Sequence, residues 1–104
     1  MPQPIAATVV WDADNNRGTV DTITVPQGNG ATVIQWSCDT DVISGFEING
    51  LDTSVFNPPQ SGPNVTRFTT TDSNNSAQEY SYNVTATHVT GRTSSHDPKI
   101  ENGG

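Results

Sequence analysis

The sequence predicts an all-β domain, a Greek-key β-sandwich of about seven strands. Its composition is one reason, because fifteen threonines, ten valines and six isoleucines stand against one leucine and one lysine. β-Branched side chains fit a pleated, half-buried surface and lose rotamer freedom in a helix. The second reason is spacing, since turn-forming clusters of Gly, Pro, Asn and Asp recur roughly every 8 to 12 residues, as in sandwiches.

The clearest strand is the segment 78–87, where the side chains alternate with a period of two. Its expected inward face consists of Tyr80, Tyr82, Val84 and Ala86, and its outward face of Glu79, Ser81, Asn83, Thr85 and Thr87. Two aromatic side chains on one face carry a large buried area. We therefore expect this strand to be central, with Thr32, Ile34 and Trp36 forming the opposite half of the core.

The other strands are read from shorter apolar runs between turn signals. In chain order they are expected at 5–11, 19–25, 31–37, 42–49, 64–71 and 92–96. The Pro-rich segment 50–62 is expected to be irregular and held in place by Val55 and Phe56. The ending 97–104 is expected to be a loose tail.

Length and charge limit the function classes. A chain of 104 residues predicts one domain, 1–104, that buries roughly two-thirds of its unfolded surface. The formal charge is −7, and the four cations are Arg17, Arg67, Arg92 and Lys99. They form no basic stripe for phosphates, so neither nucleic acid nor an anionic membrane is expected as a partner.

The native compartment stays open. Cys38 is the only cysteine, so no internal disulfide is expected. No apolar run is long enough for a membrane span or a signal sequence. We expect a cytoplasmic protein if Met1 is the native start and an extracytoplasmic one otherwise.

Two aromatic residues suggest a first family resemblance. Trp36 on the third strand, and Tyr80 at the start of the sixth after an Asp in the preceding loop, resemble the immunoglobulin-like arrangement. That resemblance implies a Trp packed between the sheets and a tyrosine corner. The cysteine pair of antibody domains is absent, and any all-β core also places a Trp and a Tyr somewhere.

A second resemblance covers about half of the chain. The segments 23–28 and 31–36 resemble paired strands of cupredoxin-type sandwiches, and Tyr80 to Val84 followed by His88 and Arg92 resembles their copper-loop segment. In a copper-binding member Val84 would be the thiolate ligand, His88 the imidazole and Arg92 the axial methionine. Only His88 is retained, so no copper and no other cofactor is expected.

The ends of the sequence resemble a third group. The Tyr-x-Tyr-x-Val strand and the Asp97–Asn102 ending are similar to those of small uncharacterised bacterial single-domain proteins. This resemblance implies no activity.

Two groups of side chains are candidate sites. Asp12, Asp14 and Asn16 resemble the opening of a calcium loop, but the glycine and the late acid of an EF-hand are misplaced, and a polar turn explains the same residues. A second group holds His88 and His96, with Cys38, Asp39 and Asp97 as possible companions. Its members lack any paired metal-ligand spacing.

The first hypothesis is therefore a non-enzymatic interaction or structural module, such as a self-assembling subunit. Ile5 to Trp11 carries no charge, so nothing on it discourages edge pairing. We expect this strand to be covered by the same chain or to contact another chain, with 1–11 or 97–104 as the donor. The alternative is a small calcium or ligand-binding protein, and no active-site pattern indicates an enzyme.

Overall fold

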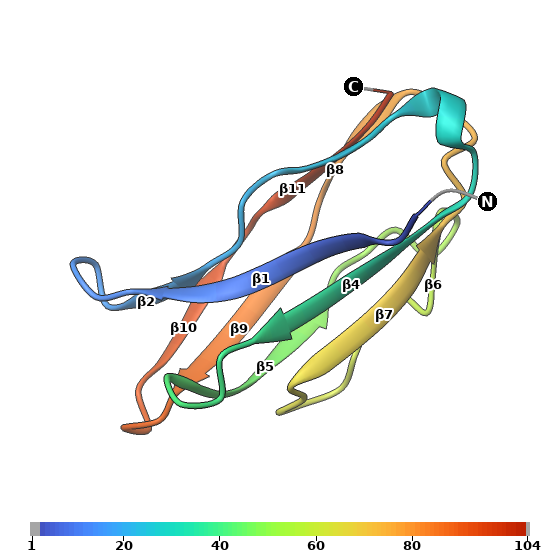
Figure 1. Cartoon of the computed structure of the whole chain (residues 1–104). Helices are drawn as coiled ribbons and strands as arrows, with labels where there is room; N and C mark the ends of the chain where they lie inside the picture. The colour runs from blue at the N-terminus through green and yellow to red at the C-terminus, as the bar shows by residue number, and fades with distance from the viewer. Residues whose placement is uncertain (1–2, 104) are drawn as a thin grey trace.

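The computed structural model describes residues 3–103, which form eleven strands and one short 3-10 helix (Figure 1). The elements are β1 (Ile5–Asp12), β2 (Arg17–Thr19), β3 (Ile23–Val25), η1 (Gln27–Asn29), β4 (Thr32–Cys38), β5 (Ile43–Asn49), β6 (Phe56–Asn57), β7 (Arg67–Asp72), β8 (Gln78–Ser81), β9 (Asn83–His88), β10 (Thr93–His96) and β11 (Lys99–Asn102). The prediction of an all-β fold is confirmed. The expected number of strands is not.

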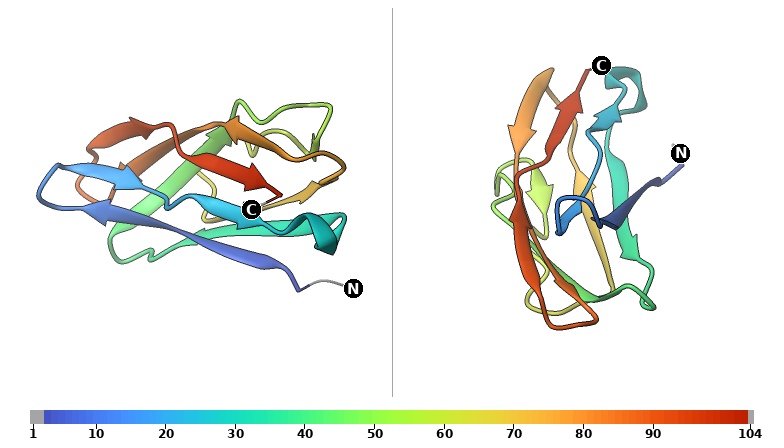
Figure 2. Two further views of the ribbon diagram at one scale, coloured as in Figure 1. Left: turned by 90° about the horizontal axis from the view of Figure 1, so that it is seen from above. Right: turned by 90° about the vertical axis from the view of Figure 1, so that its left-hand side faces the viewer.

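The strands form three hydrogen-bonded sheets. Their orders are β2-β1-β4-β7-β6, β10-β9-β5 and β3-β11-β8. Figure 2 shows the sheet of β1, β4 and β7 facing the layer that contains β5, β9, β10 and β11. The core lies between these layers.

The count exceeds seven for two reasons. The expected strands 19–25 and 78–87 are each divided where they change partners, and β6 and β11 form in segments that were expected to be irregular or loose. The segment 17–25 pairs with β1 through β2 and then with β11 through β3. Only Tyr82 separates β8 from β9, and only Asp97 and Pro98 separate β10 from β11. A strand that bends toward a second sheet loses its ladder at the bend, so each such strand is divided.

Two pairings are parallel. β1 runs parallel to β4, from Ile5 opposite Ile34 to Val9 opposite Cys38. β3 runs parallel to β11. Parallel neighbours require crossover connections, so neither pairing could come from a tight hairpin.

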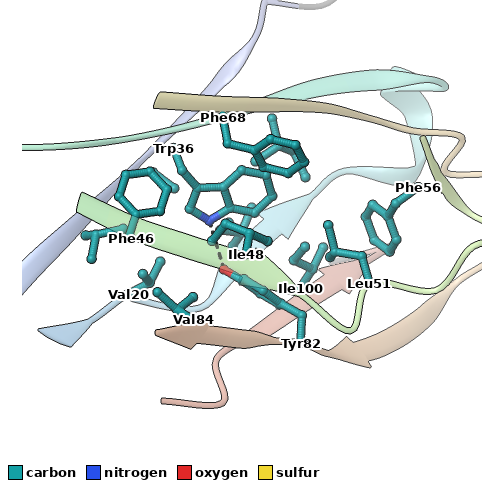
Figure 3. Close-up of a cluster of buried hydrophobic side chains, with 14 of the residues drawn as sticks. Val20, Trp36, Phe46, Ile48, Leu51, Phe56, Phe68, Tyr82, Val84 and Ile100 are labelled. Carbon is teal, nitrogen blue, oxygen red and sulfur yellow. Dashed lines mark hydrogen bonds between the residues drawn. The ribbon is translucent and has the colours of Figure 1, made fainter. Parts of the chain in front are cut away.

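The core follows the predicted alternation. Tyr80, Tyr82, Val84 and Ala86 are all buried, as are Thr32, Ile34 and Trp36. Trp36 donates from Nε1 to Tyr82 Oη at 3.0 Å, and its ring centroid lies 5.6 Å from those of Phe68 and Tyr82 (Figure 3). Burial raises the pKa of Tyr82 to about 12, although the Trp36 hydrogen bond lowers it, so the phenol stays neutral. The inward register of both strands is confirmed.

The expectation of a loose tail at 97–104 is wrong. Residues 99–102 form β11, which lies between β3 and β8 in their sheet. Ile100 is fully buried and Asn102 is buried beside it on the same face. One apolar residue among polar neighbours gives little periodicity, which is why the sequence did not indicate a strand here. Gly104 lies outside the described residues.

Gly18 marks a close approach of two sheets. It lies on β2, not in the preceding turn, and its amide donates to Ser94 Oγ at 2.8 Å. A Cβ at this position would lie 2.5 Å from the Ala86 Cβ, which is closer than real side chains allow. Only a glycine lets β2 contact β9 and β10 here.

We expect Gly18→Ala to lower the free energy of unfolding by about 1 to 3 kcal/mol, the range for overpacking a core. Urea unfolding followed by circular dichroism measures the loss. Gly28→Ala is the matched control, because a Cβ there meets nothing within 4 Å. Equal stability of the two variants would contradict the close approach.

Candidate interaction surface

An open strand edge lies beside β1. β4 covers one side of this strand along Ile5–Val9, whereas β2 covers the other side only along Val10–Asp12. After Thr19 the chain leaves β1, and β3 joins β11 instead. No strand of the described chain pairs with the outer side of Ile5–Val9, and Figure 2 shows β1 and β3 separating toward the N-terminus. The end of this strand is therefore covered by the same chain, and its beginning is open on one side; the expected contact with another chain stays a prediction.

The separation leaves a groove of about 340 Å³. It is lined by Ile5, Ala6, Ala7, Thr8, Val10, Val20, Asp21, Thr22, Ile23 and Thr24. Asp21 is the one charged side chain in this set. Val10 is 50% exposed, which is unusual for a large apolar residue of this protein. Six of the ten lining residues are apolar.

The edges formed by β5, β6 and β8 carry protecting features. Val65 exchanges two backbone hydrogen bonds with Phe46 of β5, at 2.8 and 2.9 Å. β6 has only two residues and runs into Pro58, and β8 carries the Glu79 partner of Lys99. Short strands, prolines and charges are the usual devices that blunt an edge. The edge of Ile5–Val9 has none of them along its length.

The candidate calcium residues form a self-contained turn. Asp12 Oδ1 accepts from the amides of Asp14 and Asn15 at 3.1 and 3.4 Å, and its Oδ2 accepts from Asn15 Nδ2 at 2.7 Å. The Asn15 side chain holds the pKa of Asp12 below its ordinary value. Asp14 and Asn16 are exposed, and Asn16 has a φ of 53°. The turn itself accounts for these residue types.

The structure separates the two histidines. The His88 ring packs on Trp11 with centroids 4.8 Å apart, and its Nδ1 is 2.9 Å from Thr90 Oγ1. His96 lies opposite Val84, so four positions of the ladder, about 13 Å, separate the two. Among residues 3–103 no three His, Cys, Asp or Glu side chains form a group that could hold a metal ion.

The other candidate residues also lie apart. Cys38 is half-buried, and its Sγ is 3.7 Å from the Ile43 carbonyl oxygen. Burial raises the pKa of its thiol, with Asp39 adding to the effect. Asp39 accepts from the Asp41 amide, and Asp97 accepts from Asn83 Nδ2 at 3.0 Å. The thiol is neutral, and no imidazole among residues 3–103 forms a hydrogen bond with it.

Sequence reasoning missed a buried polar cluster, which we call the Asp72 cluster: Asp72, Asn74 and Asn102. Their exposed fractions are 0%, 2% and 5%. Burial raises the pKa of Asp72, while hydrogen bonds from Asn102 and Asn74 lower it. One signal was available, because the alternation of β7 places Asp72 on the same face as Phe68 and Thr70.

No family model and no curated protein matches this chain. None of the described residues form a helix long and apolar enough to cross a membrane.

Proposed function

We propose that this protein is a non-enzymatic interaction module that binds an extended strand of another chain along the open edge of β1. The observation that carries the proposal is the missing neighbour of Ile5–Val9 beside the groove. Alternate residues of an edge strand present unpaired amide and carbonyl groups, which a guest strand can satisfy. Its side chains would then enter the groove.

The partner that we propose is a second copy of the chain, which makes the protein a self-assembling subunit. Two β1 edges related by a twofold axis pair antiparallel and bring the same surface of each copy together. The edge carries no charge from Ile5 to Val10, so no like charges oppose each other along it. The ending 97–104 is not the donor strand, because β11 is already paired on both sides.

We also propose that the strand arrangement of this sandwich is cupredoxin-like and not immunoglobulin-like. In immunoglobulin domains the first two strands share a sheet with the fourth and fifth. Here β1 pairs with β4, the counterpart of the third expected strand. This pairing favours the cupredoxin-like resemblance over the immunoglobulin-like one, without the copper ligands, since Val84 is in the core and Arg92 is exposed.

Light scattering coupled to size exclusion tests self-assembly. We expect the wild-type mass to rise with protein concentration, and to rise further with salt, because screening weakens the repulsion between chains of charge −7. Thr8→Lys should keep the protein monomeric, since an added charge on an edge strand opposes pairing.

Thr69→Lys is the matched control. Thr69 is also an exposed threonine, but it lies on β7 opposite Gln35. Its replacement by lysine changes the net charge by the same amount as Thr8→Lys. The control should associate like wild type. A wild-type protein that is monomeric at every concentration, or a Thr8→Lys variant of unchanged mass, would contradict the self-assembling subunit.

A further inference from the structure

The Asp72 cluster joins the end of β7 to the end of β11, next to the loop that contains η1. Asp72 Oδ1 accepts from the Asn74 amide at 2.8 Å and from Asn102 Nδ2 at 2.9 Å. Asn74 Nδ2 donates to the carbonyls of Pro26 and Gly30, both at 2.9 Å. Two asparagines therefore converge on one buried carboxylate.

Within residues 3–103, three buried side-chain oxygens of the cluster have no hydrogen-bond partner: Asp72 Oδ2, Asn74 Oδ1 and Asn102 Oδ1. Reversing the two amides does not remove the problem. The Asn74 nitrogen already faces two carbonyls, and the Asn102 nitrogen faces a carboxylate oxygen, so a reversal would oppose acceptor to acceptor. The unpaired atoms of both side chains are thus oxygens.

Buried acceptor oxygens without a partner require a cation or a hydrogen-bond donor beside them. An isolated buried carboxylate is costly, and the partners that Asp72 has in the described chain are neutral donors. A proton on Asp72 would serve one neighbouring acceptor, and a water donates to two. A cation bound between the three side chains would satisfy Asp72 Oδ2 and the two amide oxygens at once.

We propose that the Asp72 cluster binds a hard cation, with calcium as the ion to test. Carboxylate, amide and backbone carbonyl oxygens are the ligands that calcium takes. With a single carboxylate the site is weak, and we expect a Kd of about 10⁻⁴ to 10⁻³ M, the range of low-affinity calcium modules. The ion would hold β7 against β11, and so hold one sheet to another.

The experiment is thermal unfolding of metal-depleted protein, with calcium, magnesium, sodium or potassium added. For a domain of this size, 10 mM calcium should raise the Tm by roughly 6 to 12 °C. Asp72→Asn should abolish the rise, because it removes the charge and keeps the side-chain shape. Asp12→Asn should keep it, which separates this site from nonspecific effects of calcium on an acidic surface and from the turn at Asp12.

Amide NMR shifts of the wild-type protein locate the ion without any substitution, so the test survives if Asp72→Asn does not fold. Saturable shifts at 72–74 and 102–103 on calcium addition would support the proposal. Shifts confined to 12–16 would overturn it. A Tm that no added cation changes would also overturn it, and would leave a protonated carboxyl or an internal water as the guest.

Discussion

Replacing Trp36 with alanine should lower the free energy of unfolding by about 3 to 5 kcal/mol, the range for deleting a large core aromatic side chain. Trp36 is fully buried, and both Phe68 and Tyr82 pack on its ring. The substitution also removes the donor to Tyr82 Oη, which then faces the cavity. Because a domain is stable by only about 5 to 15 kcal/mol in total, the variant should be close to unfolding at 37 °C.

Urea unfolding followed by far-ultraviolet circular dichroism measures this loss. Trp11→Ala is the control, because Trp11 is only partly buried and packs at the margin of the core against His88. Trp11→Ala should lower the free energy of unfolding clearly less than Trp36→Ala does. A Trp36→Ala variant that loses under about 1 kcal/mol would show that the core does not depend on this residue, against the range for core aromatic deletions.

Local periodicity predicted which faces are buried. Trp36 and Tyr82 meet in the core because each lies on the apolar face of a strand that alternates cleanly. In a strand this alternation is dictated by the backbone, so it can be read without knowing any partner strand. In β5 the bulge between Ile43 and Gly45 shifts the register, so that Ile43 is buried together with Phe46 and Ile48, which regular alternation alone would not predict.

Strand pairing could not be read in this way. The parallel pairing of β1 with β4 joins residues about thirty positions apart, and nothing in either strand specifies it. The groove depends on this pairing, because it forms where β3 leaves β1 for β11. The sequence indicated an uncharged edge strand, but not that Ile5–Val9 would lack a neighbouring strand on one side.

The Asp72 cluster was missed for a different reason. Asp72 and Asn74 lie in a polar run that is typical of an exposed turn, and Asn102 lies in a segment without apolar periodicity. Polar residues are mostly exposed, so pattern reasoning assigns them to the surface. They are buried because β11 pairs with β3 and β8, and these pairings join segments far apart in the sequence.

Removing residues 99–104 should abolish cooperative folding. This deletion takes away β11, which pairs with β3 on one side and with β8 on the other, so both neighbours lose their ladders. It also removes Ile100, which is fully buried, and the Asn102 amide that donates to Asp72. An internal strand with a buried side chain contributes far more than a frayed terminus.

Thermal unfolding of the truncated protein, together with its amide NMR dispersion, tests this expectation. Ile100→Ala is the graded version and should cost about 2 to 5 kcal/mol, as for other buried isoleucines. Lys99→Ala is the control on the same strand. Its ion pair with Glu79 is about half exposed, so we expect a change of at most about 1 kcal/mol. A truncated protein that melts cooperatively at the wild-type Tm would show that 99–104 is a dispensable tail. Because the deletion removes Asn102, the same result would also show that the Asp72 cluster contributes little to stability.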